Sequence, residues 1–407
     1  MTVRNNVKKK KKKRRILMKG IKKFGALVMA GTLAVGMTAC GSASSKSTKT
    51  DSTKKETSNM KVAMITDYGD ITDQSFNQTT YEACKTFAND NGIKFTYKKP
   101  SGDSTAERGA MIDKAIAEGY NVIVMPGYAF AGAIVEKSGM YKDTKFVALD
   151  VADFDLTDYA KKNNKEFYKD NVYSAVYQEE LPGYMAGYAA VKMGYKNIGF
   201  LGGMAVPAVQ RYGYGFVQGA DAAAAEIGAT DVNCKYVYAG GFAPTPDIKA
   251  AMDTWFQNGT QIVFSCGGGI FNSACDAASA AKGKIIGVDV DQKATIDGKY
   301  GDGLCVTSAM KGLGATVNTL LSDIKDGKWS KHAGKIETLG LVSADDMTKN
   351  YVGLPEDSTA FNDTFTKADY EGLVAKMVKG DVKVSNDTSA EKPVVKSITL
   401  DFQGNLK

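Results

Sequence analysis

Residues 145–150 read KFVALD and residues 284–289 read KIIGVD, and each of these short apolar runs is the last in a series of four. The first series begins at Lys61 (KVAMIT), Lys94 (KFTYK), Asn121 (NVIVMP) and Lys145, at intervals of 33, 27 and 24 residues. The second begins at Ile198 (IGFLGG), Val232 (VNCKYVY), Gln261 (QIVFS) and Lys284, at intervals of 34, 29 and 23 residues. Amphipathic stretches separate the runs, which is typical of parallel strands joined by helices. The repeated spacing therefore predicts an α/β protein with two Rossmann-like lobes.

Three further segments, residues 171–182, 303–310 and 335–342, lie where the chain would pass between the lobes, so we expect a hinge of several strands. The expected domains are lobe 1 (60–175), lobe 2 (176–305), and return segments, hinge and a carboxyl-terminal helix (306–407). That helix, around 367–379, is expected to pack on lobe 1. Two S-x-x-E/Q spacings, Ser75 to Gln78 and Ser104 to Glu107, predict capping boxes at helix starts after the first two strands.

The amino-terminal end differs in composition from the rest of the chain. Residues 1–40 hold twelve of the 52 Lys and Arg residues and no Asp or Glu, and the sixteen residues 24–39 are apolar. This arrangement predicts a signal peptide at 1–39. Met37-Thr38-Ala39-Cys40 is similar to a lipobox, which predicts a lipid on Cys40; the alternative is a buried cysteine after a plain signal peptide. Residues 40–59, rich in Ser, Thr and Lys, would then be a flexible tether to the extracytoplasmic face of the cell membrane.

Charge and composition exclude several functions. Beyond residue 40 the chain has 40 basic and 45 acidic residues, a net charge of −5, so no nucleic-acid partner is expected. The chain has one histidine, His332, which leaves no basis for a Ser-His-Asp triad or a histidine zinc site. Phosphate-binding and calcium-binding motifs are missing. We therefore expect neither an enzyme nor a cofactor. Five cysteines follow Cys40 without C-x-x-C spacing, and we expect small core residues, mostly free.

Aromatic residues and carboxylates gather in the loops that would follow the strands. In open α/β sheets ligands bind at the carboxyl ends of the strands. Phe76 follows the first strand of lobe 1, and Phe242 follows the second strand of lobe 2 beside glycines that admit a close approach. One ring from each lobe would form a sandwich for a flat ligand. The alternative is that both rings belong to the core, and spacing alone does not separate the two interpretations.

The same loops carry the motifs of a known family. The stretch DYGDITDQSFN (67–77) resembles the signature of the basic membrane protein family of lipoproteins, which are purine nucleoside receptors of ABC importers. The stretches FVALD (146–150), YAGGF (238–242), CGGG (266–269), GVDVDQ (287–292) and SAMK (308–311) are similar to other family motifs. The resemblance runs from about residue 61 to residue 384. It implies a type I periplasmic-binding-protein fold, and a monomer that delivers nucleosides to an ABC permease and ATPase.

The resemblance also implies roles for single residues. Phe76 and Phe242 match the pair that stacks on the base; Asp67 and Asp150 match its edge carboxylates, with Asn77 nearby. Asp289 and Lys311 match the ribose-binding residues, and Gly268 contributes backbone. Asp73 and Asp291 are interpreted as structural, because aspartates at strand ends often cap the next helix. The alternative function is a binding protein of the same fold for a sugar or a signalling ligand, acting as a receptor.

Overall fold

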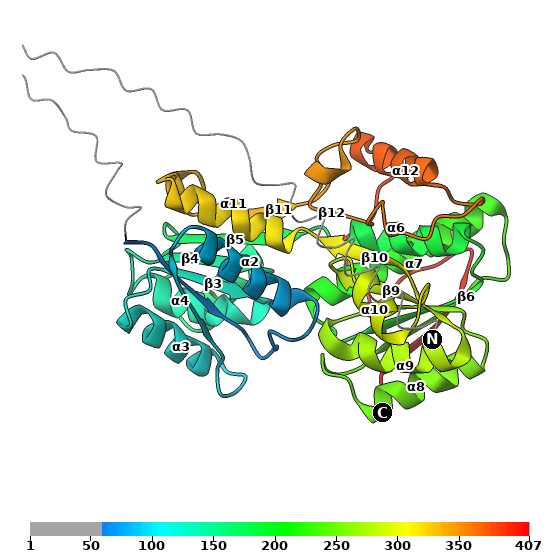
Figure 1. The fold of residues 1–407 in the computed structure, drawn as a ribbon, viewed down its shortest axis with the longest axis horizontal. Helices are drawn as coiled ribbons and strands as arrows, with labels where there is room; N and C mark the ends of the chain where they lie inside the picture. The colour runs from blue at the N-terminus through cyan, green and yellow to red at the C-terminus, as the bar shows by residue number, and fades with distance from the viewer. Residues whose placement is uncertain (1–58, 407) are drawn as a thin grey trace, which may run out of the picture. The chain divides into compact units, whose positions relative to one another are not determined.

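The structure is a computed structural model that describes residues 59–406, and it contains two β-sheets flanked by helices (Figure 1). All eight predicted strands are present, and each begins within one residue of its expected start. The strands are short and most of their residues are buried, as expected for parallel strands covered on both faces. The prediction of a two-lobed α/β fold is therefore confirmed.

The first sheet consists of six parallel strands in the order β11-β5-β4-β3-β1-β2. Five of its strands follow the 2-1-3-4-5 order of doubly wound folds. The point at which successive strands begin to be added on the opposite side lies between β1 and β3. The strands are β1 (Lys61–Ile65), β2 (Lys94–Lys98), β3 (Val122–Pro126), β4 (Lys145–Leu149), β5 (Val172–Tyr177) and β11 (Ile336–Leu339).

The second sheet has seven strands in the order β12-β10-β9-β8-β6-β7-β13. All pairs are parallel except β10 with β12. The switch point in the strand order lies between β6 and β8. The two lobes therefore share one order of their first five strands, and the prediction of two lobes of similar α/β design is confirmed. The strands are β6 (Asn197–Gly202), β7 (Asn233–Tyr238), β8 (Ile262–Cys266), β9 (Lys284–Asp289), β10 (Cys305–Lys311), β12 (Val352–Gly353) and β13 (Thr399–Asn405).

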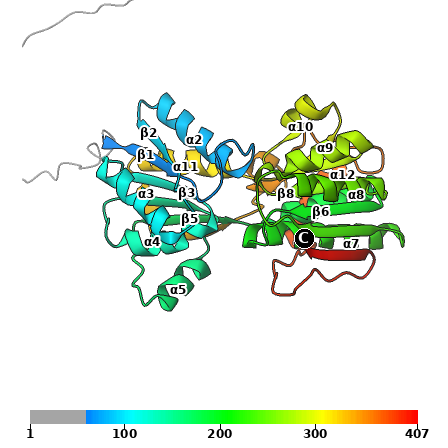
Figure 2. The ribbon, with the colours of Figure 1, turned by 90° about the horizontal axis from the view of Figure 1, so that it is seen from below.

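Helices cover both faces of each sheet (Figures 1 and 2). On the first sheet, α2 (Phe76–Asp90) and α11 (Leu313–Lys325) share one face, and α3 (Thr105–Ala117), α4 (Ala131–Ser138) and α5 (Asp153–Lys162) the other. On the second sheet, α6 (Glu180–Lys192), α7 (Pro207–Ile227) and α12 (Lys367–Lys379) share one face, and α8 (Pro246–Gln257), α9 (Phe271–Ala281) and α10 (Lys293–Tyr300) the other. Short 3-10 helices are η3 (Tyr128–Phe130), η4 (Gly268–Ile270), η5 (Trp329–Lys331) and η6 (Met347–Lys349).

The chain passes between the two sheets at three places. Residues 178–179 join β5 to α6, Gly312 joins β10 to α11, and residues 340–351 join β11 to β12. The first passage lies inside a predicted segment, the third overlaps one, and Gly312 lies two residues after the predicted 303–310. These passages form the expected multi-strand hinge.

One expectation about the carboxyl-terminal part and one about helix starts are wrong, and one strand was not predicted. Helix α12 packs on the second lobe and not on the first, because its buried residues join the core of α6 and α7 after the third passage has returned the chain there. Strand β13, which the sequence analysis did not identify, adds an edge to the same sheet beside β7. The Ser75 hydroxyl does not cap α2; the Asp73 carboxylate accepts the free N–H groups instead. Ser104 does accept from the Glu107 N–H, as expected.

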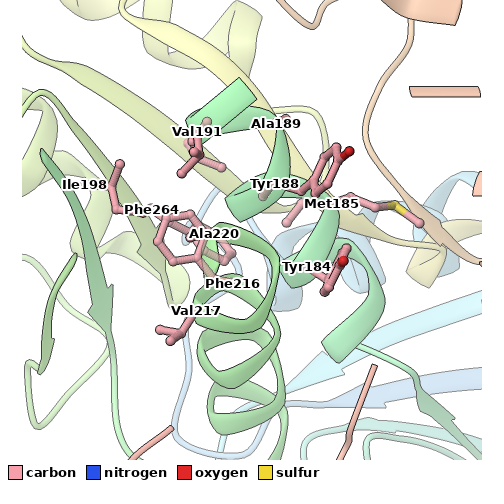
Figure 3. Close-up of a cluster of buried hydrophobic side chains, with 14 of the residues drawn as sticks. Tyr184, Met185, Tyr188, Ala189, Val191, Ile198, Phe216, Val217, Ala220 and Phe264 are labelled. Atoms are coloured by element: carbon pink, nitrogen blue, oxygen red, sulfur yellow. The ribbon is translucent and has the colours of Figure 1, made fainter. Parts of the chain in front are cut away.

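The second lobe contains an unusually close helix pair. Tyr184, Met185 and Tyr188 on α6 lie near Phe216 and Val217 on α7 in the buried cluster of Figure 3. Glycines at the contact bring the two backbones together, since added Cβ atoms would overlap the facing carbonyl groups; these are Gly183, Gly187, Gly215 and Gly219.

Two further properties concern the chain between residues 59 and 406. None of its helices is both long and apolar enough to span a membrane. Cys84, Cys234, Cys266, Cys275 and Cys305 are buried and free, as predicted. Cys40 and the predicted signal peptide lie outside the described residues.

Candidate functional site

The eight predicted binding residues all line one cavity of about 750 Å³. They come from both lobes: Asp67, Phe76, Asn77 and Asp150 from the first, and Phe242, Gly268, Asp289 and Lys311 from the second. Each lies at or just after the carboxyl end of a strand, where parallel strands direct their loops to one edge of the sheet. This geometry explains why residues more than 200 positions apart in the sequence meet here.

Asp67 follows β1 and is almost completely buried. Its Oδ1 accepts the backbone N–H groups of Tyr68 at 2.7 Å and Gly69 at 2.8 Å. Its Oδ2 lies against Gly127, where a Cβ atom would overlap it. Burial raises the pKa of the Asp67 carboxyl to about 6, although the two N–H groups oppose the shift. The carboxyl therefore changes protonation in a mildly acidic range.

Asn77 lies on the first turn of α2 and lines the cavity near Asp67. Its backbone N–H and its side-chain Nδ2 donate to Asp73 Oδ2 at 2.9 and 3.1 Å. Asp73 therefore orients Asn77 and caps the helix, which agrees with its interpretation as structural, and it also lines the cavity. The Asn77 Oδ1 is buried without a hydrogen-bond partner, which leaves an acceptor for a ligand. Asp291 lies outside the cavity lining and accepts the Lys293 N–H at the start of α10.

Five aromatic residues line the cavity, three more than the sequence predicted: Tyr68, Phe76, Tyr128, Tyr212 and Phe242. Tyr68 and Phe242 come from different lobes, and their rings lie nearly parallel, at 14° and 6.0 Å between centroids. Phe76 lies beneath the Lys311 ammonium, whose Nζ is 4.7 Å from the ring centroid. Phe76 and Phe242 are half-buried in the cavity wall, so neither belongs wholly to the core.

Glycines allow the Phe242 ring to take this position. Gly267, with φ of +151°, and Gly268, with φ of +52°, have backbone conformations that side chains rarely adopt. A Cβ on Gly203 would overlap the Phe242 ring, and one on Gly268 would lie 3.2 Å from the Phe242 carbonyl oxygen. The backbone of the CGGG stretch after β8 therefore lies close to Phe242, because its glycines have no side chains to clash with it.

Lys311 is the centre of a buried ionic group that contains Asp150, Glu179 and Asp289. Its Nζ donates to Asp150 Oδ2 at 2.5 Å and to Glu179 Oε1 at 3.2 Å, and lies 3.8 Å from Asp289 Oδ1. Glu179 Oε2 also accepts from Arg211 Nε at 2.6 Å. The sequence analysis assigned Asp150 to the base edge, but its carboxylate is paired with Lys311, in the group assigned to the ribose. Asp150 Oδ1 has no partner.

The pKa values in this group reflect burial opposed by ion pairing. Burial raises the pKa of Asp150 to about 6 and also raises that of Asp289, while Lys311 opposes both shifts. Burial would raise the pKa of Glu179 too, but Arg211 and Lys311 together lower it. Burial alone would lower the pKa of Lys311, but Asp150, Glu179 and Asp289 raise it above its usual range. Lys311 is therefore a permanent cation among acceptors.

Asp150 and Asp289 occupy equivalent places in the two lobes. Both end the fourth strand of their lobe, and both have a left-handed backbone, with φ of +62° and +67°. Such strain in a non-glycine residue is typical of functional sites. Only one Asp289 oxygen faces away from the first lobe, because Oδ2 accepts from Ser75 Oγ at 2.7 Å. Oδ1 remains, 3.5 Å from the Tyr212 hydroxyl.

The sequence analysis missed Tyr68, Glu179 and Arg211. Tyr68 lies within the quoted signature, and an aromatic residue in a loop after a strand is a signal that could have identified it. Glu179 is fully buried, and Arg211 is the only basic residue of α7. Buried charges of this kind require partners, but the identity of the partner follows only from the fold. Across residues 59–406, no three His, Cys, Asp or Glu side chains are grouped so as to hold a metal ion.

Comparisons with known proteins agree with this architecture. The profile of the Bmp family, described as ABC transporter substrate-binding protein PnrA-like, matches residues 60–387. The ABC transporter nucleoside-binding protein BmpA of Lactococcus lactis is 27% identical over 304 residues, which cover 70% of this chain and 80% of that protein. The CD4+ T-cell-stimulating antigen of Listeria monocytogenes is 29% identical over 385 residues, covering 89% and 98%.

Solved structures show the same fold. An ABC transporter solute-binding protein from Aeropyrum pernix aligns with a TM-score of 0.60 at 21% identity, over 81% of this chain and 88% of that one. One from Conexibacter woesei has the same TM-score and identity, over 80% and 99%. The neighbours are solute-binding proteins of the type I periplasmic fold, a class of binding proteins and not of enzymes. With its profile matched over most of the chain, this protein belongs to the Bmp family of PnrA-like substrate-binding proteins of ABC transporters.

Proposed function

We propose that this protein captures a nucleoside, most favourably a purine nucleoside, in the cavity between its lobes and delivers it to an ABC importer. The observation that carries the proposal is the pairing of aromatic rings with hydrogen-bond acceptors in one cavity, beside a buried Asp289–Lys311 group. The relative named a nucleoside-binding protein supports it.

The base would bind among the aromatic rings. Stacking on Phe76 and Phe242 contributes about 1–3 kcal/mol for each ring. Asp67 Oδ2 and the unpartnered Asn77 Oδ1 are acceptors in the same wall. Two acceptors at a base edge favour a base that presents N–H donors, as guanine does at N1 and N2.

The sugar would bind at the ionic group. Asp289 Oδ1 accepts from a ribose hydroxyl, and Lys311 donates to a sugar oxygen while keeping Asp289 charged. Asp150 Oδ1, which has no partner, offers a further acceptor. Gly268 would contribute its backbone. A site built for hydroxyls leaves these groups unpaired when the sugar is missing, and such sites discriminate strongly.

Delivery to an importer requires that the receptor stay at the membrane. We propose that a lipid on Cys40 anchors the chain to the extracytoplasmic face, with residues 41–59 as the tether. The names of relatives as lipoproteins and basic membrane proteins support this. In fractionated cells, Cys40→Ala protein should carry no lipid, and variant protein found in the membrane fraction with lipid attached would contradict the anchor.

The binding proposal is tested by calorimetry with guanosine and guanine. Guanosine should bind the wild-type protein at least tenfold more tightly than guanine, and Asp289→Ala should remove most of that difference. Asp291→Ala is the matched control, because this neighbouring aspartate caps α10 outside the cavity. Equal affinities for guanosine and guanine in the wild-type protein would reject the sugar site. Binding of free sugars in place of nucleosides would favour a sugar receptor.

A further inference from the structure

Two hydrogen bonds join the lobes beside the cavity, one of them buried and the other partly buried. Ser75 Oγ of the first lobe donates to Asp289 Oδ2 of the second at 2.7 Å. Gln292 Nε2 of the second lobe donates to the Gln74 carbonyl oxygen of the first at 2.9 Å. Ser75 is 0% exposed and Gln292 is 1% exposed, so the Ser75–Asp289 bond is shielded from water, while Gln74 in the second bond is an exposed residue. We call these four residues the clasp.

Each side of the clasp is held in place by its own lobe. Gln292 Oε1 accepts the Val288 N–H at 2.9 Å, and the Gln292 backbone N–H donates to Ser308 Oγ at 3.1 Å, so its Nε2 alone reaches the first lobe. Gln74 has a left-handed backbone with φ of +54°. The Ser75 N–H donates to Asp73, which frees its hydroxyl from capping α2. Strain and restraint on both sides indicate a built contact.

The clasp acts on two parts of the binding site at once. On the first lobe, Ser75 directly precedes Phe76 and Asn77, which line the cavity. On the second lobe, it occupies one oxygen of Asp289. Because Oδ2 is bound to Ser75, the carboxylate cannot rotate freely, and Oδ1 stays on the side of Tyr212 and Lys311.

We propose that Ser75 and Gln292 are positioning residues for the ligand, which fix the Asp289 carboxylate toward the sugar only when the lobes close. Neither residue lines the cavity, so they act through Asp289 and through lobe closure. The inference rests on the proposed role of Asp289 in the nucleoside site. It makes recognition of the sugar and closure a single event.

The first test measures guanosine affinity and dissociation rate. Ser75→Ala should weaken binding about tenfold to one-hundredfold, since a hydrogen bond to a charged group is lost, and the change should lie in the dissociation rate. Gln292→Glu should weaken it at least about tenfold, because it keeps the acceptor for Val288 and replaces the donor to Gln74 by an oxygen. Ser138→Ala is the matched control: Ser138 is a buried serine of the first lobe whose hydroxyl has no partner. Affinities of Ser75→Ala and Gln292→Glu equal to the wild type would overturn the proposal, and Ser138→Ala should bind as the wild type does.

A double-mutant cycle separates positioning from a general structural role. If Ser75 acts through Asp289, the variant carrying Ser75→Ala and Asp289→Asn should bind guanosine about as weakly as Asp289→Asn alone. Losses that multiply would show that Ser75 acts independently of Asp289 and would overturn the inference. A lowered melting temperature of unliganded Ser75→Ala protein with unchanged affinity would do the same.

A measurement on the unliganded protein tests the clasp even if the protein does not bind nucleosides. Carbon NMR of the Asp289 carboxyl, identified by comparison with Asp289→Asn, reports its titration in the unliganded protein. The groups facing it are Ser75, Tyr212, Lys311 and Glu179. Loss of the Ser75 donor in Ser75→Ala should raise the pKa of Asp289, and an unchanged titration would count against the clasp. Absence of guanosine binding to wild-type protein with a shifted titration would reject the nucleoside and retain the clasp.

Discussion

Tyr68 covers part of the ring that is proposed to stack on the base. Its ring comes from the first lobe and lies 6.0 Å from Phe242 of the second, nearly parallel to it. A contact of this kind forms only when the lobes are closed, so it should stabilise the liganded state. We expect Tyr68→Ala to weaken guanosine binding by about 0.5–1.5 kcal/mol, and Tyr68→Phe to keep the wild-type affinity. Titration calorimetry checks both. Tighter binding by Tyr68→Ala would show instead that Tyr68 competes with the ligand for Phe242.

Single residues show where prediction from the sequence succeeds and where it ends. The eight predicted site residues line one cavity because strand ends of parallel sheets meet, and strand ends are visible in local patterns. The hydrogen-bond partners of these residues cannot be identified from local sequence patterns. Ser75 has the spacing of a capping residue, but Asp73 satisfies the helix and Ser75 binds Asp289, 214 positions away. Likewise, nothing local shows that Asp150 pairs with Lys311.

At the scale of the element, the contact between α6 and α7 depends on glycine. A Cβ atom on Gly187 would overlap the backbone carbonyl of Phe216, which cannot move without displacing α7. We expect Gly187→Ala to lower the free energy of unfolding by at least 1–3 kcal/mol, the usual range for overpacking. Gly372→Ala, in an exposed part of α12 with open space around it, should raise the free energy by about 0.5–1 kcal/mol. Urea unfolding measures both, and a Gly187→Ala protein as stable as the wild type would contradict the close contact.

Elements were predictable to different degrees for the same physical reason. The strands of the two series are continuous apolar runs, which need no knowledge of their neighbours. Helix α12 is amphipathic, so its pattern shows that it buries one face but not against which lobe. Strand β13 alternates exposed and half-buried residues at a sheet edge, a weak signal that depends on the presence of β7.

At the scale of the whole molecule, the two lobes repeat one another down to the backbone. KFVALD and KIIGVD end in aspartates with matching left-handed conformations, and both aspartates meet at Lys311. The repeat therefore supplies one carboxylate from each lobe to a single lysine. Closure brings these like charges together in a buried place, and Lys311 and Arg211 offset their repulsion.

The buried carboxyls also set how the stability of the unliganded protein depends on pH. Glu180 lies just after the first passage between the lobes, is buried, and has an Oε2 without a partner. Burial raises its pKa from 4.5 to about 7, so the folded protein binds a proton there that the unfolded chain has released. The stabilising effect of this proton is complete below about pH 4.5 and is lost as the pH rises through about 7.

Glu180→Gln makes that prediction specific, because the amide keeps the shape of the neutral acid at every pH. The gain in unfolding free energy from this substitution, relative to the wild type, should be larger at pH 8 than at pH 5 by roughly 2–3 kcal/mol. An exposed glutamate provides the control, and Glu371→Gln should show no such difference. Denaturant unfolding at the two pH values gives the comparison. A gain that is the same at both would mean that Glu180 is ionised in the folded protein, and that the start of α6 carries a buried charge beside Glu179 and Arg211.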